Sequence, residues 1–152
     1  MRLYNEQYPD SVRAEHDDSV AAHCVHGHLV AGFMREFEAE RGFNFLKLRG
    51  LQVVNIFDRV VARMKKVSAE GRHQNADTEQ QRCFDRQEDI PGLPPAALRL
   101  TFGYEPDPAF STCERVIVAC PNGKAIRWAA QIVEDGGLYV WNDITVPRLK
   151  LG

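Results

Sequence analysis

The chain has 152 residues, of which 44% are hydrophobic and 26% charged, and its formal net charge is −2. Such a composition argues against a chain that is disordered throughout, because the apolar content is enough to offset the chain entropy. It also argues against a uniformly basic nucleic-acid binder. We expect one domain over residues 1–152, with a helical part over 1–90 and an antiparallel meander over 97–145.

Charge is distributed unevenly along the chain. Residues 41–75 hold eight basic residues against two acidic ones, whereas residues 1–40 hold three basic residues against eight acidic ones. Segments of opposite sign can pair within the fold, and that is the simpler interpretation. The alternative is a basic surface that is left open for an acidic partner.

The first predicted helical region covers residues 11–41. Its apolar side chains recur four residues apart, at Val25, Leu29, Phe33 and Phe37. Asp17, Asp18 and Ser19 offer a second possible N-cap inside the region, so a short helix followed by a longer one is also compatible with the pattern. Gly42 is a natural stop for the longer helix.

The second predicted helix covers residues 44–68. Its apolar side chains step by four, three, four and three residues, at Val53, Phe57, Val60, Met64 and Val67. On a helix this spacing would place Arg59, Arg63 and Lys66 together on another face. We therefore interpret these three cations as one basic stripe.

A third, short helix is predicted over residues 78–88. Thr78 and Gln81 match a capping box at its start, and Pro91 requires it to end earlier. The proline-rich stretch 91–95 is then a stiff loop and the best internal boundary.

After this loop the apolar pattern changes to a period of two, which predicts strands. The expected strands cover residues 98–104, 114–120, 125–133 and 138–141, and Asn122-Gly123 predicts a hairpin turn. The fold class that follows is α+β, with N-terminal helices packed on a C-terminal antiparallel sheet of three or four strands. We expect no parallel strands, because no crossover segment separates these runs.

Partner binding is the function that the sequence favours most. The candidate residues are Arg59, Arg63 and Lys66 on the basic stripe, and Tyr139 and Trp141 on the last strand, where exposed aromatic side chains are typical of interface hot spots. An ordinary solvated helix face is the simpler interpretation of the stripe. If Leu138 and Val140 face the core, the two aromatic side chains project outward.

Two other functions are compatible with the sequence. A nucleic-acid-binding protein or small nuclease would use the basic stripe and polar sheet positions, namely Arg99, Thr101, Arg115, Arg127 and Gln131. It would lack a histidine base in the sheet, because no histidine follows His73. A metal site at His23, Cys24 and His28 is the weaker idea, since no face of the helix supplies four ligands.

Familiar catalytic and targeting motifs are absent from the sequence. The sequence contains no phosphate-binding glycine loop, no nucleophile elbow, no secretory signal and no membrane-length apolar run. We therefore expect a non-enzymatic macromolecule-binding or regulatory module of a cytosolic, microbial protein, with no cofactor. Its partner would be another protein or a second copy of the chain, with nucleic acid as the alternative and no membrane.

Overall fold

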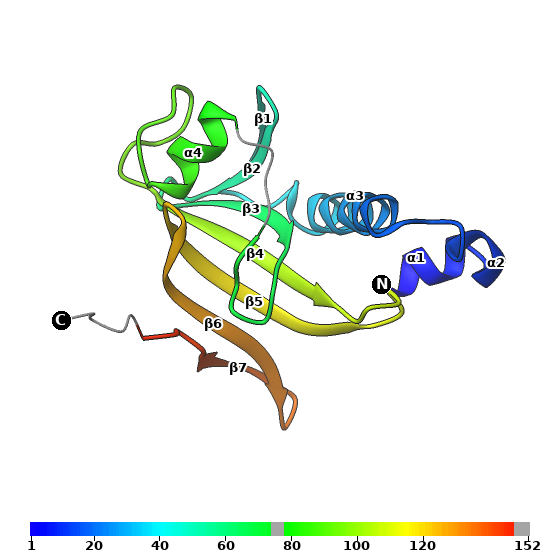
Figure 1. Cartoon of the computed structure of the whole chain (residues 1–152). Coiled ribbons are helices and arrows are strands. Elements are labelled where there is room, and N and C mark those ends of the chain that lie inside the picture. Colours follow the sequence, from blue (N-terminus) through cyan, green and yellow to red (C-terminus); the bar gives the residue numbers. More distant parts are fainter. Residues whose placement is uncertain (74–77, 148–152) are drawn as a thin grey trace.

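A sheet of seven strands runs through the computed structural model, which describes residues 1–73 and 78–147 (Figure 1). The strands lie in chain order from one edge to the other. Their bounds are β1 (Phe43–Leu48), β2 (Leu51–Ile56), β3 (Val60–Lys66), β4 (Leu98–Pro106), β5 (Cys113–Asn122), β6 (Ala125–Asp135) and β7 (Leu138–Asp143). The helices are α1 (Arg2–Gln7), α2 (Asp10–Arg13), α3 (Asp18–Phe37) and α4 (Glu79–Asp85).

The helix predicted over residues 44–68 is wrong, because this segment forms β1, β2 and β3. Gly50 turns β1 into β2 with a φ of 80°, and Phe57 and Asp58 turn β2 into β3 with φ values of 53° and 54°. The helical spacing was misleading because β2 and β3 are covered on both faces. Val53 and Val54 are both buried, for example, so the alternation that marks a half-buried strand is absent.

The predicted sheet of three or four strands, without a parallel pair, is also wrong. The four predicted C-terminal runs coincide with β4 to β7, but the three earlier strands extend the same sheet. The β3 and β4 strands are parallel, and Arg63 lies opposite Thr101 in their register. The segment between these strands contains α4 and provides the crossover connection that parallel strands require. The proline-rich stretch 91–95 lies within that connection and does not divide the sheet.

The N-terminal helices agree in part with the prediction. The region predicted over 11–41 contains a short helix, α2, and a long one, α3, and the Asp17 side chain caps α3 by accepting from Val20 N–H at 2.8 Å. The α3 helix ends at Phe37, before Gly42. The α1 helix was not predicted. The α4 helix begins after Thr78, whose hydroxyl accepts from Gln81 N–H at 3.3 Å.

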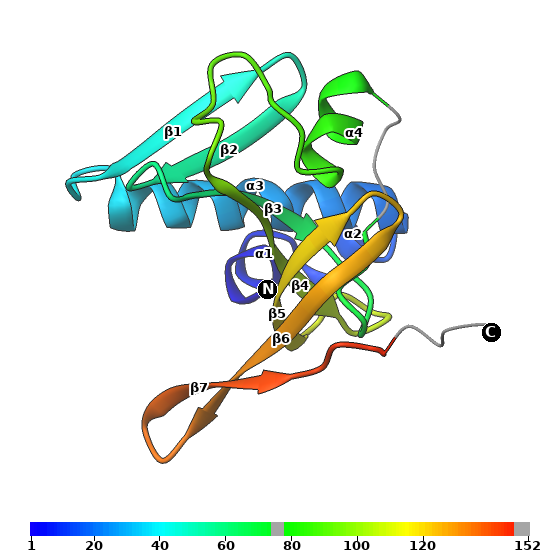
Figure 2. The same cartoon turned by 90° about the vertical axis from the view of Figure 1, so that its left-hand side faces the viewer.

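Helices lie on both faces of the sheet and not on one alone (Figures 1 and 2). On one face, Phe84 of α4 packs with Val53 and Val61 of the sheet. On the other face, Val25 of α3 packs with Tyr104 near the end of β4. In the described part of the chain, no helix is both long enough and apolar enough to span a membrane.

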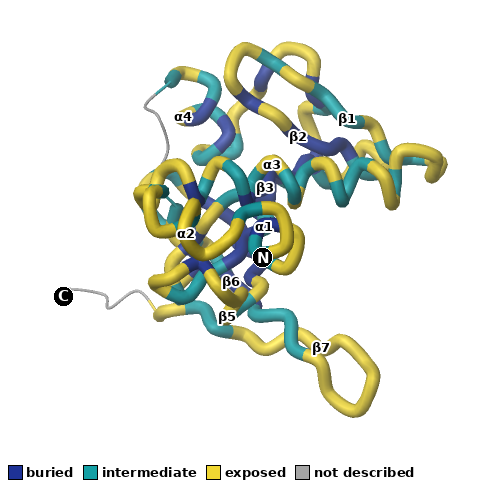
Figure 3. The backbone as a smooth tube through the Cα atoms, turned by 90° about the vertical axis from the view of Figure 1, so that its right-hand side faces the viewer, coloured by how far each residue is buried: buried dark blue, intermediate teal, exposed yellow. Residues whose placement is uncertain are grey.

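The β6–β7 hairpin extends beyond the helices (Figure 2). Figure 3 shows that its tip and β7 are exposed, and every residue of β7 is exposed. The β7 strand pairs only with β6, so it forms an edge of the sheet. The helices therefore cover β2, β3 and β4, and they leave the C-terminal edge open.

Gly103 of β4 lies close to the chain that follows β3, so a substitution at Gly103 tests the packing of these two parallel strands. A Cβ at this position would lie 2.5 Å from a methyl group of Val67, the residue after β3. We expect Gly103→Ala to lower the free energy of unfolding by about 1–3 kcal/mol, as overpacking does. Urea unfolding measures this difference.

Gly27→Ala is the matched control, because a Cβ at Gly27 on α3 would meet nothing within 4 Å. We expect this control to raise the free energy of unfolding by up to about 1 kcal/mol, since alanine favours the helix. Equal effects of the two substitutions would contradict the packing described at Gly103.

Candidate functional site

An apolar row crosses the open part of the sheet at right angles to its strands. Tyr104 of β4 lies opposite Val116 of β5, which lies opposite Ile132 of β6, which lies opposite Trp141 of β7. Residues that are paired across strands point to the same face. The row therefore runs from the buried end of β4 to the exposed edge strand.

A groove of about 640 Å³ lies along this row, between α3 and the sheet. Its helix side is lined by Val25, Leu29 and Phe33, and its sheet side includes Val116, Ile132 and Trp141. Val116 is 48% exposed and Trp141 is 61% exposed. Large apolar side chains that are joined in one open surface mark a docking site more often than isolated ones do.

The β7 strand is exposed on both of its faces, which corrects part of the sequence-based expectation. Tyr139 is 75% exposed and projects into solvent together with Trp141. Leu138 does not face a core, because it is 71% exposed. The strand thus presents apolar side chains on both faces next to a free edge.

The second feature is a buried arginine, Arg63, on the face of the sheet that α4 covers. Its side chain is 1% exposed. Its Nε donates to Thr101 at 3.2 Å, one Nη donates to Gln81, and the other lies against Asp85 and His73. Every nitrogen of this guanidinium therefore has a partner within the fold, as a buried charge requires.

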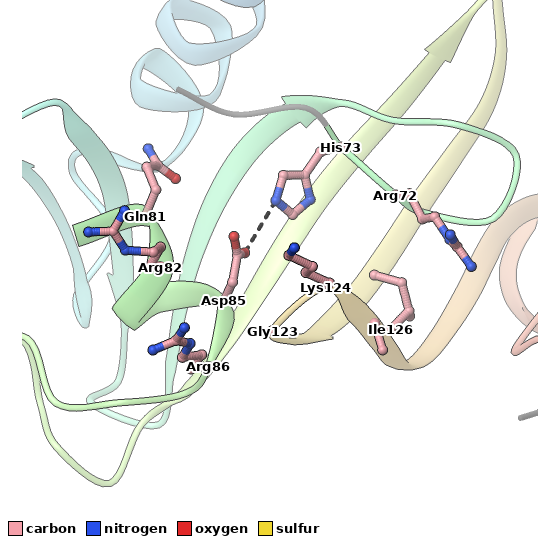
Figure 4. A pocket seen from close by; sticks show the side chains of 10 residues that line it. Arg72, His73, Gln81, Arg82, Asp85, Arg86, Gly123, Lys124 and Ile126 are labelled. Carbon is pink, nitrogen blue, oxygen red and sulfur yellow. Dashed lines mark ion pairs between the residues drawn. The ribbon is translucent and has the colours of Figure 1, made fainter. Parts of the chain in front are cut away.

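Asp85 and His73 complete this network at the wall of an open cleft (Figure 4). Asp85 Oδ1 lies 3.2 Å from His73 Nε2. Burial raises the pKa of Asp85, but the hydrogen bond from His73 and the charge of Arg63 outweigh it and hold the pKa below its usual value. Burial lowers the pKa of Arg63, and Asp85 opposes that shift. With 8% of its side chain exposed, His73 offers little surface to a substrate.

No protein-family profile matches the chain, and no curated protein or solved structure matches it.

The predicted basic stripe does not exist as one surface. Arg63 is buried, whereas Arg59 is exposed in the turn before β3 and Lys66 is exposed at the end of β3. Arg63 and Lys66 are three residues apart on a strand, so they point to opposite faces. Lys66 lies with its ammonium 4.7 Å from the centre of the Phe110 ring. Partner binding by Arg59 and Lys66 remains a prediction, and the two residues do not belong to one surface together with Arg63.

The three residues predicted to bind a metal, His23, Cys24 and His28, each have different surroundings in the structure. The His23 ring lies 2.7 Å from the Ser19 carbonyl oxygen, and His28 lines the apolar groove. Cys24 packs against the apolar cluster that contains Tyr4, Val25 and Tyr104. Among residues 1–73 and 78–147, no group of three or more His, Cys, Asp or Glu side chains could hold a metal ion.

The polar sheet positions do not form one open surface either. Arg99 and Thr101 are buried, Arg115 pairs with Glu105 at 3.5 Å, and Arg127 is exposed on β6. No sequence pattern indicates that Asp85 and His73 meet Arg63, because that contact depends on the crossover between two parallel strands.

The Asp85–Arg63 contact predicts a pH-dependent loss of stability. Asp85→Asn leaves the Arg63 charge buried without its carboxylate, which should lower the free energy of unfolding by about 3 kcal/mol near neutral pH. Because the folded pKa of Asp85 is depressed, its contribution is complete above the ordinary pKa of 3.8 and is lost as the pH falls through the folded value. The difference between wild type and variant should therefore narrow below pH 3.8.

Urea unfolding at several pH values measures this difference, with Glu134→Gln on exposed β6 as the control. A variant as stable as wild type near pH 7, or a difference that does not change with pH, would count against the ion pair.

Proposed function

We propose that this chain is a non-enzymatic protein-binding module that docks an apolar, extended segment of a protein partner along the groove and onto β7. The observation that carries this proposal is the continuous row from Val116 through Ile132 to Trp141, which joins the groove to an exposed edge strand. Burial of such a surface against a partner would supply the hydrophobic free energy of association.

The free edge of β7 supports a protein as the partner. Its outer side leaves a row of backbone N–H and C=O groups without a neighbouring strand in the described part of the chain. The part of the partner that leaves the groove can turn and add to such an edge as an extended strand along β7, and its alternate side chains then reach one face. Tyr139 and Trp141 lie at this edge, and aromatic side chains of these types dominate binding energies at interfaces.

Charge around the hairpin indicates the chemistry of the partner. Glu134, Asp135 and Asp143 are exposed at the two ends of the β6–β7 ladder. This acidic border favours a segment whose apolar residues are flanked by basic ones, and it disfavours nucleic-acid phosphates. The nucleic-acid alternative needs a basic helix face and open sheet arginines, but residues 44–68 form strands and Arg99 is buried.

The cytoplasm is the compartment we propose for this function. All four cysteines are unpaired thiols: Cys24, Cys83, Cys113 and Cys120. Reduced thiols are typical of proteins in a reducing compartment.

Substitution of Trp141 tests the docking surface. A partner would first be captured from the cell of origin and then purified, and its Kd for the chain would be measured by calorimetry. We expect Trp141→Ser to weaken binding about 30-fold, which corresponds to a hot-spot contribution of about 2 kcal/mol.

Val146→Ser is the matched control, because Val146 is 59% exposed but does not line the groove. It should leave the Kd unchanged. Equal binding by Trp141→Ser and wild type, with both proteins folded, would exclude this surface.

A further inference from the structure

A second cavity lies on the opposite side of the sheet from the apolar groove. Its volume is about 610 Å³, within the range of small-molecule sites. The walls come from the segment before α4, from α4 itself and from the β5–β6 turn (Figure 4). The charged and titratable residues that line it are Arg72, His73, Arg82, Asp85, Arg86 and Lys124.

The cavity is strongly cationic because its carboxylate is already neutralised. Asp85 is the one acidic residue among the described residues that line the cavity, and the Arg63 guanidinium holds it from the buried side. Arg63 itself does not line this cavity. Arg72, Arg86 and Lys124 therefore line the cavity with no unpaired carboxylate among its described lining residues.

The described acids that pair with Arg72 and Arg86 lie outside the cavity and hold these two arginines weakly. Arg72 lies 3.4 Å from Glu70, and Arg86 lies 3.8 Å from Glu88, but both pairs are about half exposed. Solvent-exposed pairs of this kind contribute little free energy, so either arginine can leave its carboxylate for a multivalent anion. An anion that contacts several cations at once would compete well with them.

The two walls are held at a fixed separation. The backbone N–H of Gly123, in the β5–β6 turn, donates to the backbone carbonyl of Asp85 at 2.7 Å. Gly123 has a φ of 64°, which suits glycine in this turn. The bond places Lys124 beside the C-terminal end of α4, where Figure 4 shows it opposite His73 and near Asp85. A preformed cavity lowers the entropic cost of ligand binding.

We propose that this cleft binds the phosphate chain of a small oligophosphate ligand. Guanidinium groups match phosphate oxygens with paired N–H donors, and several phosphates in a chain can contact Arg72, Arg86 and Lys124 together. No aromatic ring other than His73 lines the cavity among the described residues, so the site offers no platform for stacking a base. Recognition is therefore directed at the phosphate chain and not at a nucleoside.

Isothermal titration calorimetry with inorganic tripolyphosphate tests this proposal on the purified full-length chain at about 0.15 M salt. We expect saturable binding of one tripolyphosphate per chain, and ATP should bind with a Kd within about threefold of the tripolyphosphate value. The double variant Arg86→Gln/Lys124→Gln should weaken tripolyphosphate binding at least tenfold. Both side chains are exposed, so the variant should unfold at the same urea concentration as wild type.

Arg41→Gln is the matched control, because Arg41 is an exposed cation outside the cleft. It should leave the tripolyphosphate Kd unchanged. The proposal is overturned if tripolyphosphate gives no saturable binding, or if the control weakens binding as much as the double variant. It is also overturned if ATP binds and tripolyphosphate does not, or if a single-stranded oligonucleotide binds more tightly than either. None of these outcomes depends on partner docking at Trp141.

Discussion

The buried guanidinium of Arg63 is the constraint on which the arrangement of the other elements depends. A charge with 1% exposure is tolerated only where acceptors surround it. Its acceptors come from two places, Thr101 on the neighbouring parallel strand and Gln81 and Asp85 on α4, and the His73 ring in the connection lies against the same guanidinium. The Phe84 ring lies 4.4 Å from the guanidinium carbon and closes the site from α4.

The same network explains why the molecule has two different open surfaces. By holding α4 and the preceding segment on one face of the β3–β4 pair, it forms a wall of the cationic cleft and neutralises Asp85 there. The α3 helix covers the other face of β3 and reaches only part of β4 and β5, so the apolar row toward Trp141 stays open. One face thus suits anions and the other suits an apolar segment of a protein.

The sequence predicted those parts of the fold whose patterns are local. Thr78 and Gln81 indicate the start of α4, and the alternation after residue 97 indicates β4 to β7. The pattern over 44–68 was ambiguous, because strands buried on both faces lose their period of two. The available signal was composition: β-branched residues concentrate in this segment, at Val53, Val54, Ile56, Val60 and Val61.

The candidate sites were predicted less well, because each depends on contacts between distant segments. Tyr139 and Trp141 are exposed, but no local pattern indicates that Val116 and Ile132 join Trp141 in one row. The sequence pattern predicts Arg63 as a surface cation, but the structure places it on the inner strand β3, where its side chain is buried beneath α4. Charged residues three or four residues apart can lie on one face of a helix, but the same spacing also occurs in a strand and its turn. The spacing of Arg59, Arg63 and Lys66 therefore does not distinguish a helix from a strand.

A double-mutant cycle at Arg63 and Asp85 tests the central claim most directly. The free energies of unfolding of wild type, Arg63→Met, Asp85→Leu and the double variant would be measured in urea near pH 7. If the two groups form one buried network, each single variant leaves a partner unpaired, and the double variant should recover at least about 2 kcal/mol relative to additivity. Effects that add to within about 0.5 kcal/mol would show that the two residues act independently and would contradict this account.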